Sequence, residues 1–199
     1  MLLEAENLAA ERGAELVFSD INFTLREGEG LVVTGPNGAG KSTLLRAIAG
    51  LLPLAAGRVR FEGDAEFDEV GGSCHYLGHQ NAMKTVLTVA ENLRFWRDFA
   101  GSAHLEIGEA LEMVGLGDIG HLPFGYLSTG QRRRAAIAKL LVSYRPVWLL
   151  DEPTAGLDKA SETQFAELMR AHLGDGGMII AATHHPLGLE DAAGLRMGA

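Results

Sequence analysis

Residues 35–42, GPNGAGKS, constrain the fold of this chain more than any other segment. They fit the pattern GxxxxGK[ST], and they lie between a strand-like run, residues 31–34, and a helical pattern that begins at Lys41. This order favours phosphate binding, because glycines let successive backbone N–H groups converge on an anion. A glycine-rich turn that only caps a helix is the plainer alternative. We expect a nucleotide phosphate site formed by Gly35, Pro36, Asn37, Gly38, Ala39, Gly40, Lys41, Ser42 and Thr43.

An acidic pair follows a second strand-like run. The segment VWLLDEPTAGLD places Asp151 and Glu152 directly after four apolar residues, at the sheet edge where ligands bind in open α/β folds. We expect Asp151 and Ser42 to hold Mg²⁺ beside phosphates that Lys41 contacts. Glu152 points the other way along the strand and is expected to orient or deprotonate an attacking water. A surface acidic turn is the alternative.

A second turn in the chain also has the features of an anion site. In LSTGQRRRAAI, residues 127–137, Ser128 and Gln131 form the capping-box pattern that opens a helix, with Gly130 between them. A helix N-terminus attracts anions, because its first N–H groups have no partner within the helix and its dipole is positive there. The residues alone do not explain why one small chain would have two such sites.

Composition limits the class of protein. The chain has 199 residues, enough for one well-buried α/β domain with a small subdomain. Its net charge of −9 argues against nucleic acid as a partner. Its single cysteine cannot form an internal disulfide, which favours a reducing compartment. Apolar runs are shorter than the roughly 20 residues that span a bilayer, so a membrane role requires a partner.

Strand-like and helix-like runs alternate along the chain, which predicts an α/β fold with a mainly parallel sheet. The N-terminal third is strand-rich. A helical pattern opens with a capping box at Thr88 and Glu91 and runs to about Gly115, within a mostly helical insert. We expect a single domain, residues 1–199, whose core consists of residues 1–80 and 131–199 and whose helical subdomain spans about residues 81–130.

Two polar residues have an open assignment. Gln80 ends the strand-like segment YLGHQ, and by itself such a residue is usually a solvated side chain. His184 follows the apolar run MIIAAT and would emerge at the same sheet edge as Asp151. An imidazole there could bond a γ-phosphate or the attacking water, although the adjacent His185 competes for that assignment.

Other residues have a plainer explanation than function. The spacing of Cys74, His75 and His79 matches no common zinc site, and strand packing accounts for them better. The run Arg132–Arg134 is typical of a solvated helix face. We expect the apolar residues of the insert to form its core, with one aromatic possible at the surface for a partner: Leu87, Leu93, Phe95 and Trp96.

The order of these motifs resembles the ATP-binding cassette (ABC) family of ATPases over nearly the whole chain. LSTGQ ahead of a strand that ends in Asp-Glu is its most specific element. The resemblance implies a P-loop NTPase cassette with a mainly parallel core sheet, an N-terminal antiparallel β part and a helical subdomain. It also implies ATP and Mg²⁺ as cofactors, with Ser42, Gln80 and Asp151 at the metal. Asp158 resembles the family's D-loop aspartate, and His184 its switch histidine.

The resemblance also accounts for the second anion site. In this family two cassettes pair head to tail, and each ATP lies between the phosphate loop of one chain and the signature turn of the other. Ser128, Gly130 and Gln131 would therefore serve the nucleotide of a partner chain. Two positions depart from the family pattern. Thr129 replaces a glycine of the signature, and Arg12 stands where an aromatic residue usually stacks on adenine, with Phe18 as a second candidate.

Within the family, three segments are similar to the ATP-binding subunits of cytochrome c biogenesis haem-export systems: residues 78–96, 126–134 and 183–187. This implies membrane permease and haem-handling partners at the cytoplasmic face of a bacterial inner membrane. The reaction would be hydrolysis of ATP to ADP and phosphate, coupled to haem export or to release of a haem-loaded chaperone. The alternatives are the ATPase of another ABC exporter, a soluble ABC mechanoenzyme, or a regulatory nucleotide-binding module without turnover.

Overall fold

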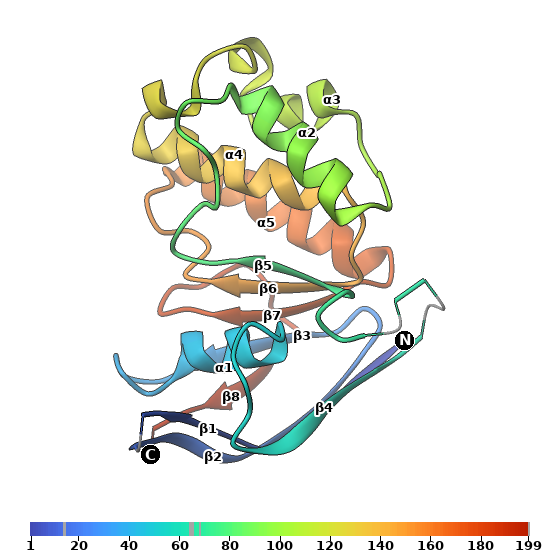
Figure 1. Ribbon diagram of the computed structural model, residues 1–199, viewed down its shortest axis with the longest axis vertical. Helices are drawn as coiled ribbons and strands as arrows, with labels where there is room; N and C mark the ends of the chain where they lie inside the picture. Colours follow the sequence, from blue (N-terminus) through green and yellow to red (C-terminus); the bar gives the residue numbers. More distant parts are fainter. Residues whose placement is uncertain (14, 64–65, 68, 199) are drawn as a thin grey trace. The chain divides into compact units, whose positions relative to one another are not determined.

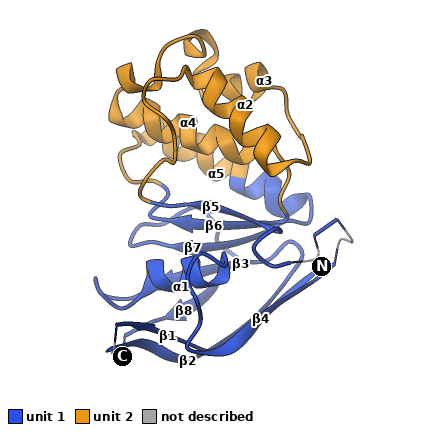
Figure 2. Cartoon of the chain, in the orientation of Figure 1, with its two compact units in different colours: residues 1–78, 146–153, 169–199 blue, residues 79–145, 154–168 orange. Residues whose placement is uncertain are grey.

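The computed structural model describes residues 1–13, 15–63, 66–67 and 69–198. The chain forms two compact units (Figure 2). Unit 1 consists of residues 1–78, 146–153 and 169–199, and unit 2 of residues 79–145 and 154–168.

Unit 1 contains a five-stranded sheet in which every neighbouring pair is parallel, in the order β5-β6-β7-β3-β8 (Figure 1). Strands β6 and β7 are buried at every residue, which explains why they appear in the sequence as continuous apolar runs. The predicted parallel core sheet is confirmed. Its strands are β3 (Gly30–Thr34), β5 (Cys74–Leu77), β6 (Val147–Asp151), β7 (Met178–Ala182) and β8 (Ala193–Arg196).

An antiparallel sheet of three strands forms the other β part of unit 1. Its order is β2-β1-β4, with β1 (Leu2–Arg12) between β2 (Glu15–Arg26) and β4 (Ala56–Glu62). Leu3 pairs with Leu25 on one side and with Phe61 on the other. The expected N-terminal antiparallel part is therefore confirmed.

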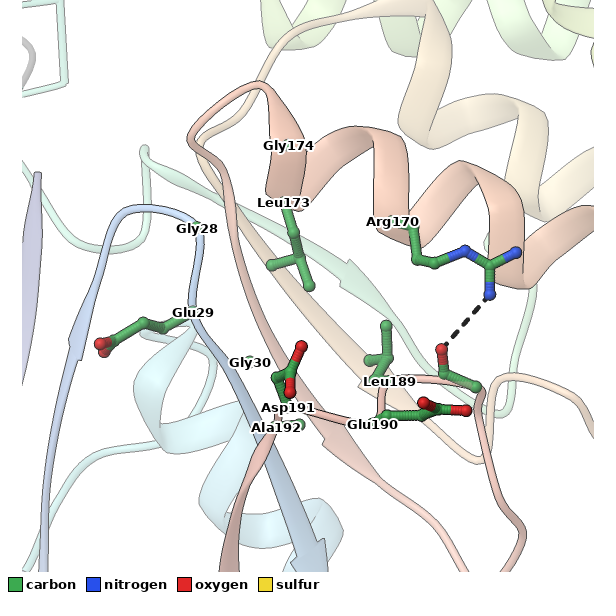
Figure 3. A pocket seen from close by; sticks show the side chains of 11 residues that line it. Gly28, Glu29, Gly30, Arg170, Leu173, Gly174, Leu189, Glu190, Asp191 and Ala192 are labelled. Carbon is green, nitrogen blue, oxygen red and sulfur yellow. Dashed lines mark hydrogen bonds between the residues drawn. The ribbon is translucent and has the colours of Figure 1, made fainter.

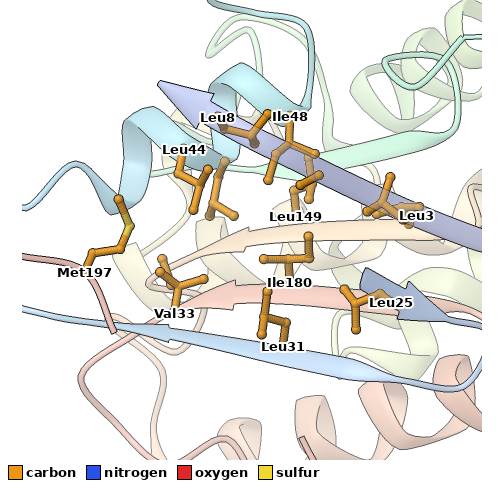
Figure 4. Packing of buried hydrophobic residues seen from close by; sticks show 14 of the residues in the cluster. Leu3, Leu8, Leu25, Leu31, Val33, Leu44, Ile48, Leu149, Ile180 and Met197 are labelled. Atoms are coloured by element: carbon orange, nitrogen blue, oxygen red, sulfur yellow. The ribbon is translucent and has the colours of Figure 1, made fainter. Parts of the chain in front are cut away.

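Helix α1 (Lys41–Ile48) and both sheets share one hydrophobic core (Figure 4). Leu44 and Ile48 of α1 are at most 1% exposed, because their spacing places them on one face of the helix. Leu3 and Leu149 bring the two sheets into the same cluster. Each fully buried leucine stabilises the fold by roughly 1.5–3 kcal/mol, so this core fixes the position of the loop that precedes α1.

Unit 2 is helical. Helix α4 (Thr129–Val142) packs against α2 (Val89–Ala100) and α3 (Ile107–Met113), and the first ten residues of α5 (Lys159–Gly174) also belong to the unit. Two short 3₁₀ turns lie between α3 and α4: Gly117–Ile119 and Phe124–Tyr126.

The helical pattern expected from Thr88 to about Gly115 corresponds to helices α2 and α3. Helix α2 ends at Ala100, because Gly101 takes a φ of +73° that does not continue a right-handed helix. The capping box at Thr88 and Glu91, which predicted the start of α2, is formed by both of its hydrogen bonds.

More of the chain belongs to the helical unit than the sequence suggested. Residues 131–145 and 154–168 belong to unit 2, whereas the sequence grouped everything after residue 130 with the core. The mostly apolar run of residues 135–142 indicates a buried helix but not which neighbours surround it. The domain boundaries drawn from the sequence remain a prediction.

Of two expectations about side chains of unit 2, one needs correction. Arg132–Arg134 is not a solvated face: Arg133 is 5% exposed, and Arg134 donates a 2.9 Å hydrogen bond to the carbonyl of Gly115. In the insert, Leu93 is buried as expected, and Phe95, at 49% exposed, is an aromatic residue at the surface of the kind the sequence allowed. On α2 its ring contacts those of Trp96 and Phe99.

Candidate nucleotide phosphate site

The loop between β3 and α1 has the backbone that its glycines predict. Gly35, Gly38 and Gly40 have φ values of +145°, +86° and +92°. A Cβ atom at Gly35 would lie 2.3 Å from the carbonyl oxygen of Met197, so the chain passes too close for a side chain. Helix α1 begins at Lys41, and the first N–H groups of a helix have no partner within it. The loop therefore presents backbone donors to an anion.

The ammonium group of Lys41 lies inside this loop. Its Nζ donates hydrogen bonds of 2.7 Å to the carbonyl of Gly35 and 3.2 Å to that of Pro36. It also lies 3.1 Å from Nε2 of His184. Lys41 is only 8% exposed, so a positive charge is held at the base of the loop, where it can contact phosphate oxygens.

Ser42 and Asp151 meet beside Lys41. The Ser42 hydroxyl donates a 2.9 Å hydrogen bond to Oδ1 of Asp151, which is the last residue of β6 and 4% exposed. The other carboxylate oxygen, Oδ2, accepts a 3.2 Å hydrogen bond from the phenol of Tyr76. Hydroxyl and carboxylate oxygens are the ligands that Mg²⁺ prefers, so this pair fits a magnesium ion.

Glu152 follows Asp151 in an unusual backbone conformation. Its φ is +43°, which is uncommon for a residue with a side chain, and its N–H donates a 2.8 Å hydrogen bond to Ala182 in the neighbouring strand. Its Oε1 lies 3.7 Å from Nε2 of His184. The same nitrogen is 3.2 Å from Oδ1 of Asn37. His184 thus lies within reach of the phosphate loop and the acidic pair at once.

The two adenine candidates lie in different surroundings. Arg12 is the last residue of β1, pairs with Glu15 across the strands and is exposed. Phe18 is 8% exposed and belongs to the hydrophobic core. A Cβ atom at Gly40 would lie 3.1 Å from Cδ1 of its ring. A buried ring has no open face for a base, which favours Arg12 over Phe18.

The remaining candidates belong to unit 2. The hydroxyl of Ser128 accepts a 3.2 Å hydrogen bond from the N–H of Gln131, whose side chain accepts one from the N–H of Ser128, so the capping box is formed at the start of α4. A Cβ atom at Gly130 would lie 3.2 Å from the carbonyl oxygen of Gly156. Gln80 is exposed beyond the end of β5.

Asp158 accepts a 2.8 Å hydrogen bond from the N–H of Ser161 in the first turn of α5. The hydrogen bonds from Ser161 lower the pKa of the Asp158 carboxyl, so this group is ionised at neutral pH.

Sequence reasoning missed Tyr76 and Arg46. The Arg46 Nε donates a 3.2 Å hydrogen bond to the Tyr76 phenol, which in turn contacts Asp151. Burial raises the pKa of Tyr76, so its phenol keeps a proton to donate at neutral pH. A signal was present, because Ser42 and Arg46 are four residues apart and so share one face of α1.

The strand explanation offered for Cys74, His75 and His79 fits the first two, which belong to β5, whereas His79 lies beyond its end and is exposed. Successive residues of a strand face opposite sides, so Cys74 and His75 do not converge. Across the described part of the chain, we find no group of three or more His, Cys, Asp or Glu side chains placed to bind a metal ion.

A separate pocket of about 600 Å³ lies at the other end of β3, away from the phosphate loop (Figure 3). The charged side chains that line the pocket are mostly acidic. The exception is Arg170, whose guanidinium donates a 3.4 Å hydrogen bond to the carbonyl of Gly188. The motif residues of the phosphate site are not part of it. The lining consists of Gly28, Glu29, Gly30, Arg170, Leu173, Gly174, Gly188, Leu189, Glu190, Asp191 and Ala192.

Among the residues that the structure describes, none of the helices has both the length and the apolar character needed to cross a membrane.

Comparison with known proteins gives consistent results. Residues 18–155 match the family model described as ABC transporter. The cytochrome c biogenesis ATP-binding export protein CcmA of Chelativorans sp. (strain BNC1) is 69% identical over 200 residues, covering 100% of this chain and 99% of that protein. The protein of the same name from Brucella abortus (strain 2308) is 64% identical, covering 96% of this chain and 89% of that protein.

Solved structures agree with the fold. The ATP binding subunit of an ABC transporter has a TM-score of 0.86 and 25% identity, covering 99% of this chain and 86% of that chain. The cassette MJ0796, a bacterial ABC transporter cassette solved as a dimer, has a TM-score of 0.82 and 24% identity, covering 98% of this chain and 94% of that chain. The second likeness is one of fold alone.

Proposed function

Because the chain belongs to the ABC transporter family, we propose that it is the ATP-hydrolysing subunit of a membrane complex for c-type cytochrome biogenesis. The observation that carries this proposal is full-length identity of 69% to a cytochrome c biogenesis ATP-binding export protein. The chain is an ABC-type ATPase, and the proposed coupling is to haem export or to release of a haem-loaded chaperone.

The chain binds ATP, and we assign its phosphates to the loop from Gly35 to Thr43. Lys41, whose Nζ donates a hydrogen bond to the carbonyl of Gly35 in this loop, would contact the β- and γ-phosphates. Ser42 and Asp151 would hold Mg²⁺. When bound, the ion neutralises charge on the transferred phosphoryl group. The support is the short Ser42–Asp151 contact and its all-oxygen donor set.

The proposed catalytic residues are Glu152, His184 and Lys41 of the phosphate loop. Glu152 would orient or deprotonate the attacking water, and His184 would donate a hydrogen bond to the γ-phosphate. Their 3.7 Å separation and the contact between His184 and Lys41 support this assignment, since all three groups can reach one phosphate. Adenine is assigned to Arg12, whose exposed guanidinium can stack on a base.

We propose that two copies of the chain pair head to tail. Ser128, Gly130, Gln131 and Asp158 would then complete the site of the partner chain. The support is the presence in one chain of two anion-binding turns, at the starts of α1 and α4. Thr129 replaces a signature glycine, but its backbone N–H remains available to a phosphate.

The proposed partners beyond the second copy are integral membrane permease subunits and haem-handling membrane proteins, with no nucleic acid. The complex would lie at the inner membrane of a bacterium, with this subunit on the cytoplasmic face. The names of the relatives, which include biogenesis and export, support this placement. The alternatives are the ATPase of another ABC exporter and, with less support, a soluble ABC mechanoenzyme.

A pull-down from gently solubilised native membranes tests the proposal. An affinity-tagged chain is expressed at its native level, and co-purified proteins are identified by mass spectrometry against an unrelated tagged ATP-binding subunit from the same cells. Recovery of a cytochrome c maturation permease with haem-handling subunits is the expected result. Recovery of another permease would keep the ATPase and overturn the haem assignment, whereas recovery of no membrane protein would favour a soluble mechanoenzyme.

A further inference from the structure

Tyr76 connects β5 to the acidic end of β6. It pairs with Leu149 in the parallel ladder, and its ring packs against the hydrophobic core of unit 1. From there its phenol oxygen reaches Oδ2 of Asp151 at 3.2 Å. The core therefore fixes the ring, and the ring in turn fixes the position of a hydrogen-bond donor.

The backbone at Gly78 holds the ring from another side. A Cβ atom at Gly78 would lie 2.6 Å from Cε1 of Tyr76 and 2.9 Å from both Cζ and the phenol oxygen. Any side chain at residue 78 would therefore displace the phenol. The ring position depends on a glycine located two residues later in the chain.

Arg46 completes the connection from the helix side. Its Nε donates a 3.2 Å hydrogen bond to the Tyr76 oxygen, which leaves the phenol proton directed to Asp151. The hydrogen bond with Tyr76 raises the pKa of Arg46, and the nearby Asp151 charge acts in the same direction. Two residues on one face of α1 are thus connected to Asp151 by hydrogen bonds. Ser42 bonds it directly, and Arg46 is connected to it through Tyr76.

We propose that Tyr76 and Arg46 are positioning residues for the magnesium site. The proposal rests on the function proposed above, in which Asp151 holds Mg²⁺. Ser42 bonds Oδ1 and Tyr76 bonds Oδ2, so each carboxylate oxygen has its own donor and the group has one orientation. Partners of this kind typically change metal affinity by about 10–100-fold when they are removed.

A residue that only packed in the core would use its ring and not its hydroxyl, so Tyr76→Phe separates the two roles. Two quantities are measured. One is the affinity of Mn²⁺ for the ADP-bound protein, followed by electron paramagnetic resonance. The other is the Mg²⁺ concentration that gives half-maximal ATP hydrolysis. Unfolding by urea in EDTA records stability without metal. Tyr144→Phe, in unit 2, is the matched control for loss of a phenol oxygen.

We expect Tyr76→Phe to weaken Mn²⁺ binding by about tenfold and to raise the Mg²⁺ requirement by a similar factor. Arg46→Gln should act in the same direction, and Arg46→Lys should restore most of the affinity, because lysine retains a cationic donor. The double variant should bind Mn²⁺ no more weakly than Tyr76→Phe alone, since Arg46 acts through the phenol.

The proposal is overturned if Tyr76→Phe binds Mn²⁺ like the wild type, whatever happens to its stability in EDTA. If Tyr76→Phe does not fold, the Mn²⁺ affinity of Arg46→Gln is measured instead, and a wild-type affinity overturns the proposal. Asp151→Asn distinguishes a failure of the underlying assignment. If Asp151→Asn also leaves Mn²⁺ affinity unchanged, the proposed metal role of Asp151 fails and this inference fails with it.

Discussion

The hydroxyl of Ser42 and the carboxylate of Asp151 are joined by a 2.9 Å hydrogen bond although 109 residues separate them in the sequence. The contact links the first turn of α1 to the last residue of β6. The shared core of α1 and β6 therefore determines the distance between the two proposed magnesium ligands, and loops play little part in it.

Substitution of Ser42 or Asp151 should slow ATP hydrolysis because it weakens the binding of Mg²⁺. Asp151→Asn is expected to lower kcat by more than about 100-fold. Loss of a residue that only hydrogen-bonds a metal ligand typically costs roughly 10–100-fold in activity, and loss of a charged ligand itself should cost more. Ser42→Ala should lower it less and raise the Mg²⁺ requirement. Phosphate release across a Mg²⁺ titration is the measurement, with the exposed Asp118→Asn as control. Unchanged Mg²⁺ dependence in both variants would contradict the assignment.

Glu152→Gln should separate ATP binding from hydrolysis. The amide keeps the shape of the side chain but cannot accept a proton, so turnover should fall by about 10²–10⁴-fold while ATP still binds. The variant should then accumulate as an ATP-bound dimer, detected by size-exclusion chromatography and absent when ADP replaces ATP. Glu167→Gln, at an exposed position of α5, is the control. Hydrolysis at the wild-type rate would remove Glu152 from its role.

Gly177 gives a test of packing in unit 1. A Cβ atom there would lie 2.3–2.6 Å from three atoms of the His172 ring. That ring stacks on Trp148 with centroids 4.0 Å apart and lies 3.2 Å from the carbonyl of Pro146. Gly177→Ala must displace it and should lower the free energy of unfolding by about 1–3 kcal/mol.

Gly174→Ala is the matched control for this change. A Cβ atom at Gly174 would meet nothing within 4 Å, and the residue ends α5, so alanine should be neutral or stabilise by up to about 1 kcal/mol. Urea unfolding of both variants measures the difference. Equal midpoints for Gly177→Ala and the wild type would mean that the ring has another position available.

The sequence was enough to predict the elements whose local pattern matches their surroundings. The apolar runs of β6 and β7 predicted a buried parallel sheet, and the glycine spacing of residues 35–42 predicted the loop backbone. The capping boxes at Thr88 and Ser128 located two helix starts. In each case a short stretch contains the physical cause of its own conformation.

The features that the sequence did not predict depend on contacts between residues far apart in the chain. Nothing near Tyr76 in the sequence indicates that its phenol reaches Asp151, because the parallel pairing of β5 with β6 creates that proximity. Similarly, Arg133 is in a run of charged residues that predicts solvation, yet its place on α4 buries it. Long-range packing of this kind is not visible in periodicity or spacing.

Lys139 gives a prediction about pH in unit 2. It is 5% exposed on α4, and its ammonium lies 4.6 Å from the centroid of the Trp96 ring. Burial, with a smaller contribution from nearby Arg133, lowers the pKa of Lys139 from 10.5 to about 8. Above about pH 8 the folded chain therefore releases a proton that the unfolded chain retains until about pH 10.5.

The sign of the effect follows from that difference in bound protons. Between these two pH values the unfolded state binds more protons, so Lys139 makes the free energy of unfolding rise with pH, by up to about 1.4 kcal/mol per unit. Lys139→Met has no such proton. Between pH 8 and pH 9.5, the free energy of unfolding of the wild type should therefore rise by about 2 kcal/mol more than that of the variant. Urea unfolding at several pH values measures this, with the exposed Lys159→Met as a control that should run parallel to the wild type. If the free energy of unfolding of Lys139→Met also ran parallel to that of the wild type against pH, Lys139 would have its ordinary pKa although it is buried. Its ammonium would then have enough polar contacts to replace water.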